Sequence, residues 1–412
     1  MTRSKHNSYR TIALCIVWMM LILIEPKSMV SVAKISNMSS IRVLLLAGLV
    51  VLYLFRRQYH IDRSTVLFAV LSIVTIFLSI VTNGDTSNYS YSLLIIVISC
   101  MLISELLSFE EFRLAYVTAM VILCQYSLIA TYLFQNIPVL SNGFLPSFSH
   151  QNGGTARDYI FCFTFTMEYG RTFRNFGIFN EPGVYMFYIT LAGTLLLFPH
   201  STKAASPIWN YVSIATILLT LVSLFSPVGY LICIIFICSL LMSHGKKENR
   251  IKYLCTALLM LFMAGFMLNY FLGESIWDIA MNSFQKVSNR GESFYSRFGS
   301  LIASVQAFFD RPFFGWGYSG TFTTVTEQYL SQYTAHYTNT PGLVFVIYGG
   351  VLGCMFIGAL WSFYRKHTSS MVACTLSFAC LLAALFNEAL LDSTVLWMLI
   401  MYGVKGRRKQ YV

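Results

Sequence analysis

Long, continuously apolar stretches recur along the whole chain, and they restrict its possible folds more than any other feature. A stretch of about 18 to 22 apolar residues is long enough for an α-helix to cross a hydrocarbon core roughly 30 Å thick. A β-barrel would instead show segments of about 10 residues that alternate in polarity. Only 11% of the 412 residues are charged and 56% are hydrophobic, whereas soluble domains carry about 25% charged residues. The sequence therefore predicts an all-α, polytopic membrane protein.

The apolar stretches predict about twelve transmembrane helices. The expected ranges are 11–31, 41–55, 65–82, 90–107, 114–134, 183–199, 207–224, 227–244, 254–272, 343–364, 371–391 and 394–404. We expect the first helix to be retained, because no small-residue cleavage site follows it. Two connections, residues 136–182 and 273–342, are too long for simple turns, and long ordered loops usually carry function. The expected organisation is one transmembrane domain, residues 1–412, whose functional residues lie in these two loops.

The distribution of positive charge predicts the orientation of the helices. Eighteen of the 28 basic residues fall in connections that lie on the N-terminal side of the membrane under this helix count. Cytoplasmic loops normally collect Lys and Arg, so both termini are expected in the cytoplasm and both long loops outside. The net charge of +11 therefore does not indicate a nucleic-acid partner. Nine of the ten cysteines lie in apolar stretches, and no pair is placed for a disulfide.

Arginine is concentrated in the two outer loops, where positive charge should be rare. The basic residues there are Arg157, Arg171, Arg174, Lys286, Arg290, Arg297 and Arg311. A guanidinium binds phosphate through paired, charge-assisted hydrogen bonds and stays protonated even in a dry site. This pattern favours a phosphorylated lipid as the ligand. The structural alternative is that these arginines pair with acidic residues of the same loops or with lipid headgroups.

The second outer loop contains an amphipathic helix. Apolar residues recur at spacings of three and four between Ser293 and Asp310, which predicts a helix that lies along the membrane surface. Arg290 and Arg297 are about two turns apart and could share one side of it. Pro312 ends the helix. The following FFGWGYSG is a glycine-rich loop in which backbone could approach a sugar or phosphate closely.

Three polar residues that precede expected helices are candidates for catalysis. Glu181 lies in RNFGIFNEPG before one helix, and His336 and Asn339 precede the helix from residue 343. Glu181 could equally serve as a helix-start carboxylate that interacts with the helix dipole, and a lone loop histidine is more often incidental. No outer DxD pair, HExxH or close set of His and Cys is present, so neither a metal ion nor another cofactor is expected. The GxSxG and Walker motifs are absent too.

Three segments together resemble a known family. RNFGIFNEPG, SRFGSLIASVQAFFDRPFFGWGYSG and NTPGLVFVIYGGVLG are similar, in order and spacing, to the segments shared by bacterial O-antigen polymerases (Wzy) and O-antigen ligases. The resemblance covers residues 170 to 355 closely. It implies a GT-C-like, metal-independent glycosyltransferase that uses undecaprenyl-pyrophosphate-linked sugars. By position it makes Arg174 and Arg297 ligands of the donor pyrophosphate, and Arg290 joins them by its place two turns before Arg297.

The resemblance leaves the catalytic base and the exact activity open. The ligase pattern has a histidine and a small polar residue where Asn339 and Thr340 stand here, and His336 lies one helical turn upstream. This departure favours a polymerase over a ligase and leaves Glu181 and His336 as competing bases, with Asn339 at the family's histidine position. An O-antigen ligase is the alternative within the enzymes. A lipid-linked oligosaccharide flippase or exporter is the alternative from another class, although it would be expected to carry charges inside its transmembrane helices.

The leading hypothesis is a polymerase of O antigen or capsule at the outer face of the bacterial inner membrane. It would join undecaprenyl-pyrophosphate-linked oligosaccharide repeats to build a surface polysaccharide such as that of lipopolysaccharide. Its expected partners are these lipid-linked oligosaccharides and membrane lipid, and a chain-length regulator protein is a further candidate. Arginines would stabilise the leaving pyrophosphate, and a base would deprotonate the acceptor hydroxyl.

Overall fold

The computed structural model describes residues 2–25, 27–28, 38–55, 62–141, 143–149, 155–159, 162–166, 173–198, 207–243, 255, 292–334, 337–368 and 370–406. Eleven of the twelve expected apolar ranges contain an α-helix. These helices are α1 (Thr2–Met19), α3 (Met38–Phe55), α4 (Arg63–Asn83), α5 (Asn88–Leu106), α6 (Phe109–Leu128), α7 (Pro182–Leu196), α8 (Pro207–Ser223), α9 (Pro227–Ser243), α14 (Thr340–His367), α15 (Met371–Leu385) and α16 (Thr394–Val404). The twelfth range, 254–272, lies outside the described residues except for Cys255.

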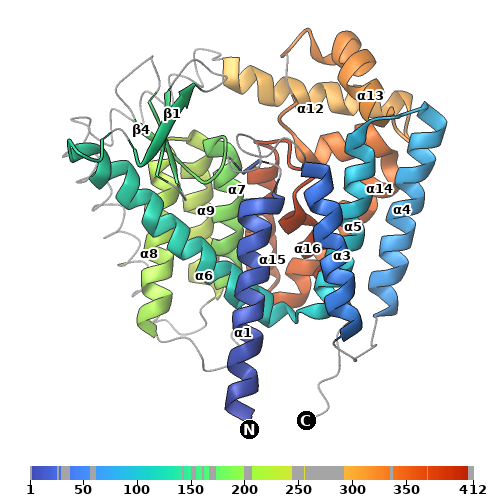
Figure 1. Ribbon diagram of the computed structural model, residues 1–412. Helices are drawn as coiled ribbons and strands as arrows, with labels where there is room; N and C mark the ends of the chain where they lie inside the picture. Colours follow the sequence, from blue (N-terminus) through green and yellow to red (C-terminus); the bar gives the residue numbers. More distant parts are fainter. Residues whose placement is uncertain are drawn as a thin grey trace.

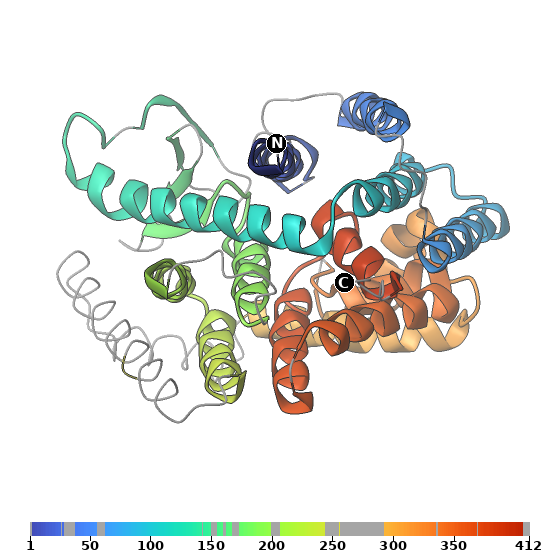
Figure 2. The same cartoon turned by 90° about the horizontal axis from the view of Figure 1, so that it is seen from below.

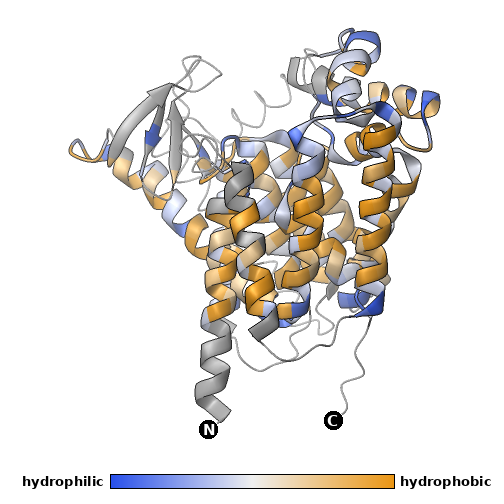
Figure 3. Cartoon of the chain, turned by 45° about the vertical axis from the view of Figure 1, so that its right-hand side comes forward, coloured by the Kyte–Doolittle hydropathy of each residue, from blue (hydrophilic) through white to orange (hydrophobic). Residues whose placement is uncertain are grey.

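Four helices are long and apolar enough to cross a membrane: α4, α5, α14, and α6 with its continuation to Leu133. That continuation is a π-helical turn, η2 (Ile129–Leu133), which a 3₁₀ turn, η3 (Phe134–Asn136), follows. α1 ends in a similar π-helical turn, η1 (Met20–Ile24). Figure 3 shows an apolar band along the bundle with hydrophilic residues at its two ends. The chain is therefore a membrane protein, and the count of twelve spans stays a prediction.

Side-chain caps fix where several helices begin and end. Asp62 accepts hydrogen bonds from the backbone N–H groups of Ser64 and Thr65 at the start of α4, and Gly84 ends this helix in the left-handed conformation with φ of 59°. Ser108 and Glu111 form a reciprocal capping box at the start of α6. The α5–α6 connection is therefore a tight turn, after which α6 crosses the bundle obliquely (Figure 2).

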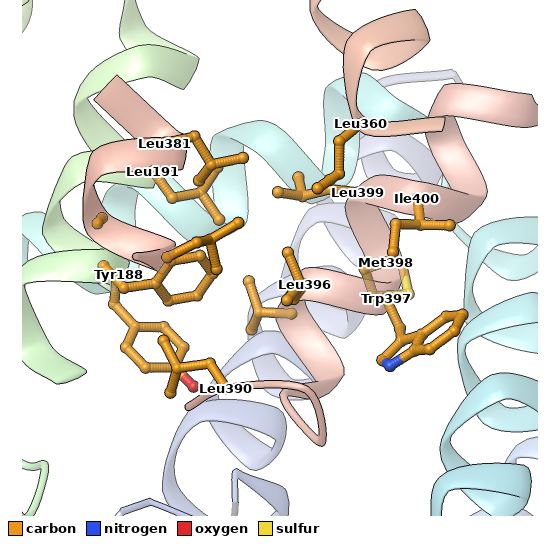
Figure 4. Close-up of a cluster of buried hydrophobic side chains, with 14 of the residues drawn as sticks. Tyr188, Leu191, Leu360, Leu381, Leu390, Leu396, Trp397, Met398, Leu399 and Ile400 are labelled. Carbon is orange, nitrogen blue, oxygen red and sulfur yellow. The ribbon is translucent and has the colours of Figure 1, made fainter. Parts of the chain in front are cut away.

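Two short helices are enclosed by the others. All residues of α7 from Gly183 to Leu195 are buried, as are those of α16 from Thr394 to Gly403. Their side chains form an apolar cluster with α14 and α15 (Figure 4). Within it, the indole N–H of the buried Trp397 donates to the Leu391 carbonyl at 2.8 Å, so its one polar atom is paired. Because neighbouring helices surround α16, its 11 residues do not have to cover the hydrocarbon core alone.

The first long loop contains a small sheet that the sequence analysis did not predict. Its four antiparallel strands follow one another in the order β1 (Leu145–Ser149), β2 (Thr155–Asp158), β3 (Phe163–Thr166) and β4 (Phe173–Gly177). The buried Asn175 attaches β4 to the bundle, because its amide donates to the hydroxyls of Ser127 at 3.0 Å and Ser223 at 3.1 Å. This sheet is the one departure from the expected all-α fold within the described residues.

The amphipathic helix expected in the second loop is present as α12 (Glu292–Asp310), which lies across the ends of the other helices (Figure 1). Its buried face consists of small residues, namely Ser300, Ala303, Ser304 and Ala307. Its exposed face carries large apolar side chains, namely Phe298, Val305 and Phe309. The sheet and a short helix pair, α13 (Gly317–Gly320) and the π-helical η4 (Thr321–Leu330), lie at the same end (Figure 1). We call this the α12 end of the bundle.

α14 is broken at Gly349, whose φ of 80° and ψ of −177° lie outside the helical region. The break frees backbone carbonyls, and two of them find new partners. The carbonyl of Val346 accepts from the Trp316 backbone N–H at 2.8 Å, and that of Ile347 accepts from the Ser79 hydroxyl at 3.0 Å. The glycine-rich loop after α12 thus approaches the backbone of α14. The sequence had indicated that this loop could approach a sugar or phosphate.

Candidate functional site

The first turns of α7 and α14 both contact the loop between α15 and α16. α7 begins after Glu181 and α14 begins after Asn339. The loop between α15 and α16 joins the two starts, because the Glu388 carbonyl accepts from the backbone N–H of Thr340 at 3.1 Å and from its hydroxyl. A helix start carries partial positive charge and free N–H groups. At α14 these N–H groups are already paired, since that of Thr340 donates to Glu388 and that of Gly342 donates to Asn339 Oδ1. The start of α7 has no side-chain cap, which favours a bound anion there.

Two carboxyl groups lie at this junction, those of Glu181 and Glu388, which we call the carboxyl pair. Glu388 is only 9% exposed, and its carboxyl lies so close to Gly183 that a Cβ there would stand 1.9 Å from Oε1. Burial, followed by the like charge of Glu181, raises the pKa of Glu388 well above its ordinary value, and Lys27 and Arg297 lower it in part. Glu388 therefore holds its proton to a higher pH than an exposed carboxyl does.

Arg297 supplies a positive charge from α12. Its charge interacts favourably with Glu388 and Glu181, although burial lowers the pKa of its guanidinium. The guanidinium remains charged, since arginine keeps its proton in proteins. Its Nε is buried, and no described residue accepts a hydrogen bond from it. Leaving such a donor unpaired costs about 1–3 kcal/mol or more, so an acceptor from a ligand would stabilise it.

Other buried polar atoms near Arg297 also lack partners among the described residues. They are Asn339 Nδ2, Asn387 Oδ1, Thr338 Oγ1 and Tyr337 Oη. Thr338 is joined to the Arg297 face of α12, because its backbone N–H donates to the Ser300 hydroxyl at 3.3 Å. Asn339 lies at the same place, since a Cβ on Gly342 would meet both Asn339 Nδ2 and Ser304 Oγ within 2.6 Å. Native proteins rarely bury several unpaired polar atoms together, so this gathering favours a ligand site.

Lys27 adds a second positive charge. It lies after η1, in a short segment that runs beside the residues before α7. The Lys27 carbonyl accepts from the Asn180 N–H at 3.0 Å, and Ser28 forms an isolated antiparallel bridge with Phe179. This backbone pairing holds Lys27 close enough to Glu388 to lower the pKa of that carboxyl.

Three of the six residues expected from sequence lie together here: Glu181, Arg297 and Asn339. Arg174 lies in β4 opposite Phe165, and the position of its side chain is outside the described part of the structure. Arg290 and His336 are also outside the described residues.

Lys27, Asn387 and Glu388 are not among the site residues expected from the sequence. The expected helix 371–391 includes Asn387 and Glu388, whereas α15 ends at Leu385 and leaves both in a buried loop. A carboxylate within an otherwise apolar stretch was the available signal, since such residues are usually functional.

The described helices and this cluster define a class: a polytopic membrane protein with a buried, charged site at one end of its bundle. No family model, curated protein or solved structure matches the chain. In the described ranges, no three His, Cys, Asp or Glu side chains gather as a metal site. The site instead offers an arginine, the start of α7 and the carboxyl pair.

Proposed function

We propose that this protein is a polysaccharide polymerase, a GT-C-like glycosyltransferase of the O-antigen polymerase and ligase type. The observation that carries the proposal is the convergence of three segments. RNFGIFNEPG supplies Glu181, SRFGSL supplies Arg297 and NTPGL supplies Asn339, and these residues lie at one site although up to 158 positions separate them. The segments that resemble the family are therefore also the segments that form the site.

The donor is an oligosaccharide linked to a lipid pyrophosphate. Arg297 binds the pyrophosphate through its unpaired Nε, and the N–H groups at the start of α7 add partial positive charge. These donors are preorganised where negative charge develops as the leaving group departs, which is where electrostatic stabilisation lowers the barrier most. Asn339 Nδ2 is a further donor at this place.

The carboxyl pair is the general base. The oxygen of an acceptor hydroxyl attacks the anomeric carbon of the donor saccharide, and the bond from that carbon to the phosphate oxygen breaks. Its electron pair leaves with the pyrophosphate, and the hydroxyl proton passes to the carboxyl pair. A pair that holds one proton retains one ionised oxygen to accept another. The reaction therefore needs Glu181 and Glu388, while His336 is not required as the base.

The position of α12 suits a substrate with a lipid tail. Its exposed apolar face, with Phe298 56% and Phe309 73% exposed, would lie in the membrane interface. Arg297 is on the buried side of the same helix. The prenyl chain can thus stay in the bilayer while its pyrophosphate reaches the guanidinium. On this proposal the α12 end faces the outer side of the bacterial inner membrane.

Replacing Arg297 with lysine tests the proposal. Lysine keeps the charge and loses the planar set of donors, so the rate of chain extension should fall about 30- to 1000-fold, from a loss of about 2–4 kcal/mol of transition-state stabilisation. The measurement is the glycan ladder from a polymerase-deleted strain that carries the variant at matched protein level. Arg311→Lys is the control, because Arg311 is exposed and binds Asn83 and the Trp316 ring instead.

The form of the ladder separates the alternative functions. A polymerase defect leaves single repeats attached to the lipopolysaccharide core, whereas a ligase defect leaves no repeat attached to the core. A flippase defect leaves lipid-linked repeats in the inner leaflet. A full-length ladder from Arg297→Lys would show that the arginine is not part of the reaction.

A further inference from the structure

Four aromatic rings lie in a row that ends beside the candidate site; we call Tyr89, Tyr318, Phe322 and Tyr337 the aromatic row. Tyr89 stacks on Tyr318 with ring centroids 4.1 Å apart, and Tyr318 lies 4.6 Å from Phe322. Phe322 meets Tyr337 edge-on at 5.7 Å. The row therefore starts at α5, passes over α13 and η4, and ends two residues before Asn339.

Hydrogen bonds to Asp85 hold the middle of the row in place. Asp85 lies in the α4–α5 connection and is 2% exposed. It accepts from the Tyr318 backbone N–H at 2.8 Å, the Ser319 hydroxyl at 2.8 Å and the Ser90 hydroxyl at 3.0 Å. Burial alone would raise the pKa of Asp85, but these bonds and those from Ser87 lower it to about 2. Asp85 is thus ionised at neutral pH and fixes the backbone that carries the Tyr318 ring.

The row is not an ordinary apolar core. Phe322 is 42% exposed, and Tyr89 and Tyr318 are half-buried. Tyr337 is 6% exposed, yet its hydroxyl is buried with no hydrogen-bond partner among the described residues. Partly exposed rings together with an unpaired hydroxyl are suited to a ligand that has both apolar and hydroxyl surfaces. Sugars have this chemistry, because the C–H bonds on one face of the ring carry partial positive charge that the negative face of an aromatic ring attracts.

We propose that the aromatic row is a saccharide-binding track, which holds the oligosaccharide of a lipid-linked repeat while its end lies at the carboxyl pair. This inference rests on the proposed polymerase function and names a part of the substrate site. The row binds sugar rings, whereas Arg297 binds pyrophosphate. Free oligosaccharide that lacks the lipid and the pyrophosphate should therefore bind the row alone.

The test uses the full-length protein in nanodiscs and the free repeat oligosaccharide, released from its carrier lipid by mild acid. Saturation-transfer NMR measures its dissociation constant. Phe322→Leu should weaken binding about two- to tenfold, the range expected from the loss of one aromatic contact of about 0.5–1.5 kcal/mol. Phe322→Trp should retain it. Arg297→Gln should bind the free oligosaccharide as the wild type does, since the probe carries no pyrophosphate.

Phe313→Ala is the matched control, because Phe313 is 71% exposed and lies outside the row. Equal affinity in wild type and Phe322→Leu, with chain extension intact in the wild type, would overturn the track and leave the polymerase standing. A wild type that does not extend lipid-linked repeats would overturn the polymerase itself. A loss of affinity in Phe313→Ala as large as in Phe322→Leu would show nonspecific adsorption and also overturn the track.

Discussion

Glu388 is surrounded by charges that act on it in opposite directions. Burial and Glu181 favour its protonated form, and Lys27 and Arg297 favour its ionised form. The net effect raises its pKa, so Glu388 keeps its proton closer to neutral pH than an exposed glutamate does. A general base is most effective when its pKa lies near the working pH, and a carboxylate exposed to water would be too acidic for this role. In the proposed reaction, burial of Glu388 would thus bring the pKa of the base closer to the working pH.

The raised pKa of Glu388 predicts how the free energy of unfolding depends on pH. The folded chain holds the Glu388 proton at neutral pH and the unfolded chain releases it, so folding binds protons and the free energy of unfolding falls as pH rises from about 4.5 through the raised pKa of Glu388. Glu388→Gln cannot ionise and should weaken this dependence. The measurement is the unfolding temperature in detergent from about pH 5 to about pH 8.

Glu327→Gln is the control, because Glu327 is exposed on η4. If the unfolding temperature of Glu388→Gln fell with pH as steeply as that of the wild type, Glu388 would not hold the proton that folding binds. Such a result would also remove the general base from the proposed reaction.

The sequence was most informative about residues at helix starts. An excess of positive charge in an expected outer loop identified Arg297. A position directly before an expected helix identified Glu181 and Asn339. Glu388 could not be assigned to the site, because its partner Glu181 lies more than 200 positions away and only the packing of α7 against α15 brings them together. Local sequence shows that a carboxylate is surrounded by apolar residues, but it does not show which charge lies opposite.

At the scale of elements, the break in α14 fixes the position of α12 and of the loop that follows it. Gly349 interrupts the helix, and the loop after α12 enters the gap, so that the Gly350 N–H donates to the Pro312 carbonyl at 2.6 Å. Gly315, whose φ is 66°, lies against the same backbone, and a Cβ on it would stand 2.5 Å from the Ile347 carbonyl. α12, which carries Arg297, is thereby anchored to α14, which begins at Asn339.

Gly349→Ala should therefore destabilise the protein. A Cβ at this position would stand 2.1 Å from the Phe313 carbonyl oxygen, and a φ of 80° is itself strained for alanine. Such a backbone conformation costs about 1–3 kcal/mol before any clash is counted. The expected loss is about 3 kcal/mol or more in the free energy of unfolding, measured by thermal or denaturant unfolding in detergent.

Gly358→Ala in the same helix is the control for the glycine at the break. No atom lies within 4 Å of its Cβ direction, and alanine in a helix interior is about 0.5–1 kcal/mol more favourable than glycine. Equal stability of the two alanine variants would show that the break is not required for the docking of the loop.

The small sheet shows what helix-based reasoning overlooks. Each of its strands has only four or five residues, too few for a clear alternation of polar and apolar residues along one strand. Its position depends on Asn175, whose two hydroxyl partners lie on α6 and α8. The helices could be predicted because their stabilising pattern lies within each segment, whereas the sheet depends on contacts between distant segments.

At the scale of the whole molecule, polar groups divide between the two ends of the bundle. The site lies at the α12 end, and at the opposite end cations pair with helix termini and acids. Arg113 binds Glu110 and the Phe198 carbonyl, while Lys405 pairs with Glu105. Arg113 and Lys405 are two of the 18 basic residues that the sequence predicts on the cytoplasmic side. The fold places both of them at the end of the bundle opposite the site.

This separation leads to a prediction of sidedness that the proposed function requires. Alkaline phosphatase fused after Asn152 or Gln332 should be active, because it folds only outside the cytoplasm. Green fluorescent protein fused after Lys247 or Lys405 should fluoresce, because the end with the paired cations should lie inside. The fusions are compared at matched protein level in living cells.

The proposed function gives a physical reason to expect this orientation. A pyrophosphate cannot cross the hydrocarbon core without a large desolvation cost, so a polymerase has to hold Arg297 on the side where the flipped repeats are. A cytoplasmic signal from the Gln332 fusion would place α12, the carboxyl pair and the aromatic row on the wrong side and would exclude the proposed reaction. Active phosphatase at both outer positions leaves the site facing the leaflet from which extracellular glycans are built.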